Sequence, residues 1–330
     1  MYKILKLLFK VSLIFIMIAV YFYSSIFISK KTLDTNFYIV KGEKYITIVE
    51  NLKNQKIITN EFAFKIYSSF VDTSKIKAGK YEFNGKYNIP QIFKTLNEDT
   101  ISTINTKNIT IIEGWNKYDV SKYLSNEFNI EYKYVLDFLK NGYKKTDLIK
   151  TYSFLNNKDI KDLEGFIYPD TYEVYENSNL EMILEKILSN FKNKVSDVYK
   201  LENKKLYEIL KIASIIEEEA KLDVDRPIVS GIIQNRLKSD MKLQIDATVI
   251  YFTQNKDNIA NDKNIENPYN TYINKGLPIG PIANPGMSSI EAAINPVATD
   301  YLFYINKDSG EAVYAKTLEE HNRNIRAYLR

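Results

Sequence analysis

The sequence predicts an α+β protein with an N-terminal transmembrane helix, and three observations lead to this prediction. Residues 11–29 form an uncharged, mostly apolar run of nineteen residues, about the length of a helix that crosses a bilayer. Short strand-like runs, such as 37–40 and 109–112, alternate with longer stretches of helical periodicity. The chain has 330 residues, more than one domain usually contains, so we expect two folded units beyond the apolar run.

The apolar run favours an uncleaved membrane anchor over a signal peptide. Lysines flank it on both sides: Lys3, Lys6 and Lys10 come before it, and Lys30 and Lys31 come after it. The larger number before the run favours an N-terminus in the cytoplasm. Aromatic residues at 21–23 stand where a signal peptide has small residues for cleavage. We therefore expect residues 1–35 to form a cytoplasmic tail and a single-pass anchor, with everything after about residue 35 outside the cytoplasmic membrane.

The segment 36–104 has the element order of a small glycan-binding fold. The expected elements are a strand at 37–40, helices at 46–54 and 61–69, a strand within 78–83 and a helix at 90–96. Asn60 is placed to cap the second helix, and Pro90 suits a first helical turn. This strand-helix-helix-strand order resembles the LysM-like fold, which binds cell-wall glycans. We expect a LysM-like α+β subdomain here.

A second, larger α+β unit is expected over residues 105–330. Its helices are expected at 118–124, 132–139, 180–199, 204–220, 228–237, 289–293 and 318–329, and its strands at 109–112, 243–251, 301–305 and 312–315. The last two strands suit a hairpin across Asp308-Ser309-Gly310. Residues 276–286 hold three Gly and three Pro with apolar residues between them, which indicates a rigid loop. Such a loop is either a wall of a binding groove or a structural crossing.

Glu217 stands where the helical pattern calls for an apolar side chain. Leu206, Leu210, Ala213, Glu217 and Ala220 are spaced by four, three, four and three residues, so they form one stripe of a helix. The neighbouring Glu218 and Glu219 rotate away from that stripe and are expected to reach water. Partial burial disfavours the charged form of a carboxyl group, which is what a proton donor near neutral pH needs. The segment therefore predicts either a general acid or a buried glutamate satisfied by an arginine or by backbone amides.

Two further segments offer polar groups for a cleft. If 243–251 is extended, Gln244, Asp246 and Thr248 lie on one face, which is either a solvated edge or the floor of a cleft. Residues 163–172 interleave aromatic rings with Glu, Asp, Gly and Pro, and Glu164 and Tyr168 lie in this stretch. Such a stretch suits a sugar-binding loop, because sugars stack on rings and need oriented polar partners, or it is an aromatic-rich turn packed on the core.

The composition excludes several classes of protein. Apolar residues make up 45% of the chain and charged residues 26%, as in ordinary globular proteins. The 45 basic and 41 acidic residues are interspersed, so we expect no nucleic-acid partner. Cysteine is absent and His321 is the single histidine, so we expect no disulfide, no metal site and no cofactor. A Ser-His-Asp triad would have to use His321, and no Gly-x-Ser-x-Gly turn accompanies it.

Seven stretches together resemble one known family. They are 163–174, 213–220, 235–237, 243–251, 269–286, 289–300 and 316–322. In order and approximate spacing they resemble the MltG (YceG-like) family of endolytic murein transglycosylases, and the Gly-Leu-Pro to Asn-Pro-Gly block at 276–286 is the most specific. The chain departs from the family's typical pattern at Glu218, where Lys or another residue is usual between two glutamates, and at Ile279, where a second Pro is frequent. Neither departure falls on Glu217.

The resemblance implies a fold, an activity and a place in the cell. It implies a LysM-like subdomain and an α+β catalytic domain behind a single helix in the bacterial cytoplasmic (inner) membrane. It implies cleavage of the β-1,4 bond between MurNAc and GlcNAc in nascent peptidoglycan strands, leaving 1,6-anhydroMurNAc ends and limiting strand length. Glu217 falls at the family's catalytic glutamate. It further implies peptidoglycan glycan strands as substrate and peptidoglycan synthases as partners.

The remaining site residues are a hypothesis about the cleft. We expect Gln244, Asp246 and Thr248 to orient substrate hydroxyl and acetamido groups. Tyr269, Asn270 and Asn284 are expected to line the opposite wall, and Glu164 and Tyr168 are further candidates. Two other functions fit the same sequence: a non-catalytic peptidoglycan-binding membrane protein, or a hydrolytic muramidase that uses Glu217 with Asp246, since hydrolases need a second carboxylate.

Overall fold

The computed structural model describes residues 2–39, 43–97, 105–176, 178–307 and 309–329. The chain divides into two compact units. Unit 1 comprises Met1–Lys107 and Glu173–Glu176, and unit 2 comprises Asn108–Tyr172 and Asn177–Arg330. The expected strand end at Val40, the expected boundary near residue 104 and Asp308 of the hairpin turn lie outside the described residues. The structure is of the mixed α+β class, as predicted.

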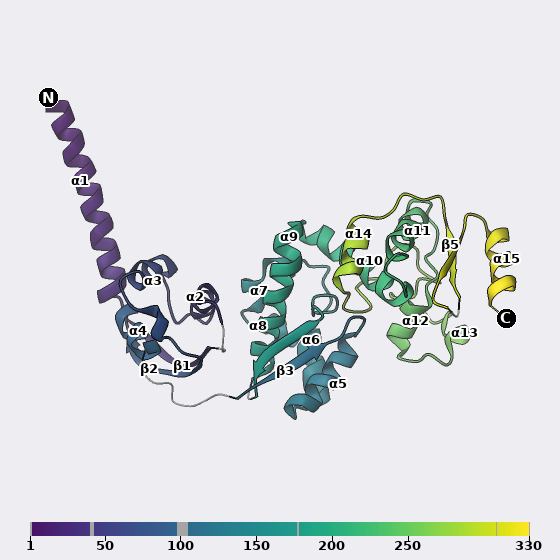
Figure 1. Ribbon diagram of the computed structural model, residues 1–330, viewed down its shortest axis with the longest axis horizontal. Coiled ribbons are helices and arrows are strands. Elements are labelled where there is room, and N and C mark those ends of the chain that lie inside the picture. Colours follow the sequence, from purple (N-terminus) through teal and green to yellow (C-terminus); the bar gives the residue numbers. More distant parts are fainter. Residues whose placement is uncertain (1, 40–42, 98–104, 177, 308, 330) are drawn as a thin grey trace. The chain divides into compact units, whose positions relative to one another are not determined.

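Unit 1 begins with the long helix α1 (Tyr2–Tyr23), which continues into the π-helical turn η1 (Ser24–Ile28) (Figure 1). Residues Phe9–Ile28 have a mean hydropathy of 2.3 and are 6% buried, so the segment is long and apolar enough to cross a membrane. Figure 1 shows α1 extending alone from the folded part of unit 1. An apolar helix left uncovered in this way needs an apolar environment that the folded protein does not supply.

The folded part of unit 1 has the expected order of elements. It consists of β1 (Lys31–Ile39), α2 (Tyr45–Asn54), α3 (Glu61–Ser68), a 3₁₀ turn η2 (Thr73–Lys75), β2 (Gly79–Tyr87) and α4 (Ile89–Asn97). Strands β1 and β2 are antiparallel, from the pair Lys31–Tyr87 to the pair Ile39–Gly79. Asn60 caps α3 as predicted, because its side chain accepts a hydrogen bond from the Ala63 amide at 3.0 Å. One face of this two-stranded sheet packs on the helices around Phe37, Phe64 and Phe83, all fully buried.

Unit 2 is mostly helical. Its helical elements are α5 (Lys117–Phe128), α6 (Tyr132–Lys140), η3 (Gly142–Lys145), α7 (Leu148–Thr151), η4 (Ser153–Leu155), α8 (Leu180–Phe191), η5 (Lys192–Ser196), α9 (Asp197–Tyr199), α10 (Asn203–Glu219), α11 (Arg226–Lys238), α12 (Asp246–Thr253), α13 (Ile259–Asp262), α14 (Met287–Ile294) and α15 (Leu318–Tyr328). Strands β5 (Phe303–Asn306) and β6 (Ala312–Ala315) form the expected hairpin. Helix α10 packs against α11, α12 and α14 at the centre of this arrangement (Figure 1).

A further pair of strands, β3 (Thr106–Ile111) and β4 (Asp170–Tyr175), forms a two-stranded sheet, and the division between the units falls within these strands. The stretch 163–172 was expected to be a loop, yet its last three residues belong to β4. The side chains that begin β4 alternate between exposed and buried positions, with Thr171 exposed and Tyr172 buried. That alternation is the strand signal that the dense aromatic content obscured.

The predicted strand at 243–251 is wrong, because most of that segment is the helix α12. Thr248, Val249, Ile250 and Tyr251 have high β-propensity, but tertiary packing overrides such preferences. Thr248 adapts to the helix by donating its hydroxyl to the Ile245 carbonyl at 2.7 Å. The predicted polar face of alternate residues therefore does not exist, and a helical face takes its place.

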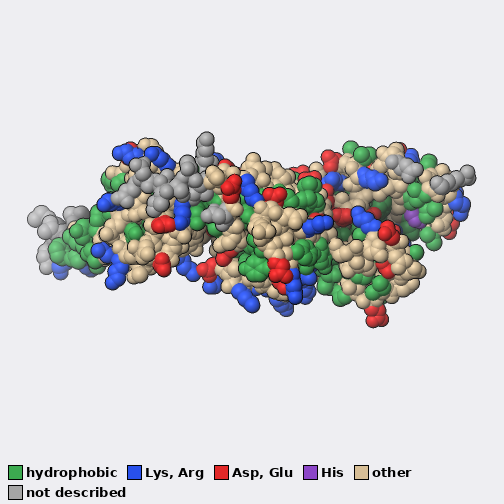
Figure 2. Space-filling view, turned by 90° about the horizontal axis from the view of Figure 1, so that it is seen from below, with side chains coloured by type: hydrophobic (Ala, Val, Ile, Leu, Met, Phe, Trp, Pro, Cys, Tyr) green, Lys and Arg blue, Asp and Glu red, His purple; other side chains and the backbone are tan. Residues whose placement is uncertain are grey.

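Basic and acidic side chains are intermixed on the face of the molecule shown in Figure 2. Hydrophobic side chains gather at the end that carries α1 and also in the middle of this face. The charge distribution on this face gives no extended stripe of one sign.

Candidate active site

Helix α10 carries Glu217 on its buried stripe. Leu206, Leu210, Ala213 and Ala220 are each at most 4% exposed, so the predicted stripe is confirmed. The Glu217 side chain is 6% exposed. A carboxyl group so far withdrawn from water needs hydrogen-bond donors from the protein.

Arg226 and Gly286 supply those donors. Arg226 Nη1 lies 3.1 Å from Glu217 Oε2, and Nη2 lies 3.4 Å from Oε1. The Gly286 amide donates to the same Oε2 at 2.9 Å. Arg226 is itself fixed at the start of α11, where Nη1 donates to Ser289 Oγ at 2.6 Å. The sequence left open a buried glutamate satisfied by an arginine or by backbone amides, and Glu217 has both kinds of partner.

The Gly- and Pro-rich loop at 276–286 is attached to α10 by two side chains one helical turn apart. Ser214 Oγ accepts a hydrogen bond from the Ile282 amide at 3.0 Å, and Glu217 accepts from the Gly286 amide. Positions three residues apart lie on one helix face, so a single face of α10 holds both points of the loop. The loop is thereby fixed beside the glutamate.

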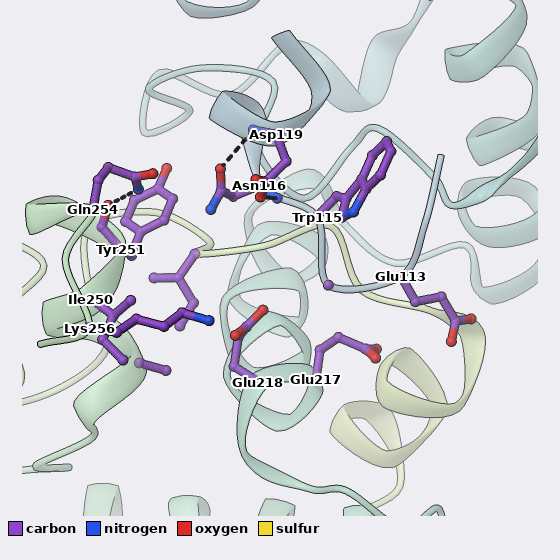
Figure 3. Close-up of a pocket in the computed structure, with 13 residues that line it drawn as sticks. Glu113, Trp115, Asn116, Asp119, Glu217, Glu218, Ile250, Tyr251, Gln254 and Lys256 are labelled. Atoms are coloured by element: carbon purple, nitrogen blue, oxygen red, sulfur yellow. Dashed lines mark hydrogen bonds between the residues drawn. The ribbon is translucent and has the colours of Figure 1, made fainter. Parts of the chain in front are cut away.

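Glu217 also borders a cavity of about 460 Å³, so the arginine does not close it off. The cavity is lined by Glu113, Gly114, Trp115, Asn116, Asp119, Glu217, Glu218, Ala247, Ile250, Tyr251, Gln254, Lys256 and Ile282. Figure 3 shows Glu217 and Glu218 projecting from adjacent positions of α10, with Glu113 on the other side of Glu217 and Lys256 extending towards Glu218. The lining is strongly acidic, with Lys256 as a basic counterpart.

Two glycines let the segment at 113–116 and the loop approach the carboxyl groups closely. Gly114 has a φ of +80°, which favours glycine, and a Cβ there would lie 3.4 Å from Glu218 Oε1. At Gly286 a Cβ would lie only 2.0 Å from Glu113 Oε1. Gly286 thus contacts Glu217 through its amide, and the Glu113 carboxyl group occupies the space that a side chain at position 286 would need.

The carboxyl groups of the cavity differ in their electrostatic environment. Burial, more than any single neighbour, raises the pKa of Glu218 to about 7; Lys256 opposes the shift and the charge of Glu217 adds to it. Burial also raises the pKa of Glu113, and the charge of Glu217 raises it further while Arg226 opposes it. Both side chains hold a proton at higher pH than an ordinary glutamate.

Glu219 differs from the expectation that it reaches water. It is half-buried, and its Oε2 accepts a hydrogen bond from the Tyr304 hydroxyl at 2.7 Å. Burial raises its pKa, and the Tyr304 hydrogen bond opposes the shift. Glu218 reaches water, as expected, although the protein atoms around the cavity partly desolvate its carboxyl group.

Gln244, Asp246 and Thr248 do not line this cavity. Gln244 is exposed, and Thr248 is fully buried with its hydroxyl 2.9 Å from that of Thr271. Asp246 pairs with Lys263 at 3.0 Å and accepts a hydrogen bond from Tyr272. The cavity is lined instead by Ala247, Ile250, Tyr251 and Gln254, which share one face of α12.

The remaining predicted residues also lie outside the lining, and several are buried in internal networks. Asn284 is fully buried; its Oδ1 accepts from the Gly165 and Ile167 amides, and its Nδ2 donates to Trp115 O and Glu164 Oε1. Asn270, also fully buried, donates to the Lys263 and Ile265 carbonyls.

Glu164 is fully buried and accepts hydrogen bonds from the Lys117 amide and the Tyr251 hydroxyl, both at 2.9 Å. Burial raises its pKa to about 8, and Asp162 adds to the shift. Tyr168 is 6% exposed, and Tyr269 packs its ring against that of Tyr251 at 4.9 Å. Glu164 and Tyr269 thus stand behind Tyr251, which itself lines the cavity.

Most of the cavity lining was not predicted from the sequence. Glu113, Gly114 and Trp115 directly follow the strand expected at 109–112 and were assigned no role, although Trp115 is the single tryptophan of the chain. A glutamate and a tryptophan directly after a strand, here Glu113 and Trp115, are only a weak signal of a functional site. A stronger one is the i, i+3, i+4, i+7 spacing of Ala247, Ile250, Tyr251 and Gln254, which is visible once 246–253 is taken as helical.

The fold and the cavity together define an α+β protein with a carboxyl-lined site of about 460 Å³. A model of the YceG-like family matches residues 37–327, and the chain belongs to that family.

Curated relatives support the same assignment. The chain is 36% identical over 314 residues to a protein of Bacillus subtilis (strain 168) named endolytic murein transglycosylase, covering 91% of this chain and 86% of the relative. It is 27% identical over 319 residues to a protein of that name from Streptococcus pneumoniae serotype 2, covering 88% of this chain but only 58% of that longer relative. A crystal structure of a YceG-like protein from Listeria monocytogenes superposes with a TM-score of 0.60 at 31% identity, covering 89% of this chain and 99% of the other.

Proposed function

We propose that this protein is an endolytic murein transglycosylase that uses Glu217 as its acid and base. It cleaves the β-1,4 bond between MurNAc and GlcNAc within peptidoglycan strands and leaves 1,6-anhydroMurNAc ends. The observation that carries the proposal is the position of Glu217. It is the side chain that the family resemblance marks as catalytic, and it borders an acidic cavity while three donors fix its carboxyl group.

The reaction needs one carboxyl group in two protonation states. Protonated Glu217 donates its proton to the glycosidic oxygen as that bond breaks and oxocarbenium character develops at the anomeric carbon of MurNAc. The resulting carboxylate then takes the proton of the C6 hydroxyl as the C6 oxygen attacks the anomeric carbon and closes the anhydro ring. No water is consumed, and Glu217 ends the cycle protonated.

The donors around Glu217 suit the carboxylate that forms midway. The Arg226 guanidinium and the Gly286 amide are already in place when the proton leaves, so the negative charge needs no reorganisation of the site. Glu113 suits the half of the cycle in which Glu217 is protonated and donates its proton. Its carboxyl group meets Gly286 from the opposite side and has a raised pKa, so we assign it the role of keeping a proton available beside Glu217.

The rest of the chain serves substrate capture and location. The segment Phe9–Ile28 acts as a single-pass anchor in the cytoplasmic membrane, supported by its length and hydropathy. The antiparallel strands β1 and β2 with α2 and α3 between them in sequence support a LysM-like glycan-binding subdomain. Such an anchored enzyme meets new strands as synthases release them, and its cuts limit strand length.

The test is product analysis on purified murein with the full-length protein. Mass spectrometry should find fragments that end in anhydroMurNAc, and Glu217→Gln should reduce their formation by at least a hundredfold. Glu319→Gln, on the exposed face of α15, is the matched control and should retain full activity. Products heavier by one water would identify a hydrolase instead. Intact glycan despite cosedimentation with murein would identify a binding protein.

A further inference from the structure

The last part of the apolar segment packs against the fold of unit 1. Ile26, within η1, is 6% exposed and lies in the core cluster of unit 1, and Phe22 packs against that cluster. The backbone carbonyl of Phe27 accepts a hydrogen bond from Asn88 Nδ2 at 2.9 Å. Protein therefore covers Ile26, which composition alone would assign to lipid, whereas Phe27 and Ile28 remain 44% and 64% exposed.

Helix α3 meets α1 just before this point. Asn60, the cap of α3, donates through Nδ2 to the Tyr21 hydroxyl at 3.3 Å. The ring of Phe62, in the first turn of α3, lies 5.5 Å from that of Phe22. Phe62 is nevertheless 63% exposed, so most of its apolar surface is left without a protein partner. Figure 1 shows α3 beside the inner end of α1.

The length of α1 fixes where the outer membrane boundary can lie. Lys10 to Tyr21 rises about 16 Å at 1.5 Å per residue. The hydrocarbon core is about 30 Å thick, which is more than this rise. Even if lysine side chains before the apolar run extend to the cytoplasmic surface, α1 must therefore stay within the bilayer at least as far as Tyr21. Tyrosines concentrate at membrane interfaces, and Tyr21 and Tyr23 are each 59% exposed. The first turn of α3 therefore sits at interfacial depth.

The charges beside Phe62 suit lipid headgroups. Glu61 is held by two lysines, with Lys53 Nζ at 2.7 Å and Lys65 Nζ at 2.6 Å. Lys53, Glu61 and Lys65 together carry one net positive charge next to an exposed ring, and Glu50 also interacts electrostatically with Lys65. An apolar side chain flanked by lysines is the pattern of surfaces that lie in an anionic membrane interface.

We propose that the α3 face, formed by Lys53, Glu61, Phe62 and Lys65, docks into the outer-leaflet interface of the membrane that holds α1. The inference rests on the proposed anchor. Phe62 inserts at the level of the headgroups and the lysines contact anionic lipid. The docked face holds unit 1 close to the membrane surface, where the glycan-binding subdomain meets strands as they emerge.

The absence of cysteine makes the test direct, because single cysteines can be introduced into the full chain without a background thiol. Thr59→Cys, exposed beside the α3 face, carries a polarity-sensitive fluorophore. Met17→Cys in α1 reports insertion, and Asn36→Cys, exposed on β1, reports the part of unit 1 away from the bilayer. Each protein is reconstituted into phosphatidylethanolamine–phosphatidylglycerol vesicles that contain brominated lipid.

Bromolipid should quench the label at 17 strongly, the label at 59 by at least half as much, and the label at 36 hardly at all. Adding Phe62→Ser should reduce quenching at 59 by more than half while leaving quenching at 17 unchanged. Strong quenching at 17 with equal, weak quenching at 59 and 36 overturns docking and leaves the anchor intact. Absence of quenching at 17 overturns the anchor and, with it, the docking.

Discussion

Arg226 donates hydrogen bonds to Glu217 from both terminal nitrogens of its guanidinium group. Nη1 lies 3.1 Å from Oε2, and Nη2 lies 3.4 Å from Oε1. The arginine side chain is 11% exposed and the glutamate 6%, so the pair is largely shielded from solvent. The pair fixes the position of the Glu217 carboxyl group beside the cavity.

Replacing Arg226 with Met should destabilise the protein by about 3–5 kcal/mol, because Glu217 stays buried without its guanidinium partner. Arg226→Lys keeps the charge but not the two-nitrogen geometry, so it should cost less stability and still lower kcat. Chemical denaturation gives the free energies of unfolding. The double variant Arg226→Met with Glu217→Gln should regain part of the loss, since a neutral amide at position 217 needs no guanidinium partner. Strict additivity of the two changes would contradict the coupling.

Glu113→Gln should lower kcat about tenfold and move the alkaline limb of the activity profile to lower pH. The reason is that the pKa of Glu113 is raised, so it holds a proton beside Glu217 at a pH where an ordinary glutamate has lost it. The profile of kcat/KM between pH 5 and 9, measured on soluble glycan strands, checks this. A uniform loss with an unmoved alkaline limb would indicate that Glu113 only supports the loop at Gly286.

Glu218→Gln should flatten the pH dependence of KM near neutrality. With a pKa of about 7, Glu218 places a new negative charge in the cavity as pH rises from 6 to 8, and bound glycan must desolvate it. We expect the wild-type KM to rise about fivefold over that range, equivalent to about 1 kcal/mol, and the variant to lose the rise. Glu319→Gln should behave like the wild type, and the same slope in the Glu218 variant would exclude this carboxyl group as the cause.

Because the pKa of Glu164 is raised, its contribution to the free energy of unfolding should fall as pH rises. Its folded-state pKa of about 8 exceeds its ordinary value of 4.5, so the folded protein holds an extra proton between these values. The stabilisation present below pH 4.5 is lost as pH rises to 8, at a rate of at most about 1.4 kcal/mol per pH unit. Glu164→Gln cannot titrate, so its free energy of unfolding should change less between pH 5 and 8, whatever its absolute value. Parallel curves for the two proteins would refute the prediction.

Asn284→Ala should lower stability by about 3 kcal/mol rather than act on substrate affinity alone. The side chain makes four hydrogen bonds in a fully buried position, and its loss leaves the Gly165 and Ile167 amides without that acceptor. Thermal unfolding checks this, with Asn264→Ala at an exposed position as control. An unchanged Tm with a raised KM would return Asn284 to the role of a substrate contact predicted from the sequence.

Local periodicity explains what could be predicted. The stripe of α10, the cap of α3 by Asn60 and the hairpin of β5 and β6 depend on residues within a few positions of one another, and all three were predicted. The prediction of a strand at 243–251 was wrong because β-branched and aromatic residues favour a strand in isolation. In the folded protein, most of that segment is the helix α12, which packs against α10.

The sequence by itself determined that one glutamate lies on a buried helical stripe and that the chain contains a segment long and apolar enough to cross a membrane. Only the tertiary structure decided what surrounds that glutamate. Arg226, Gly286 and Glu113 lie 9, 69 and 104 positions away from it, and their meeting depends on α11, the Gly- and Pro-rich loop and the end of β3 packing around α10. No local pattern encodes contacts at such separations, because they arise from the burial of many side chains at once.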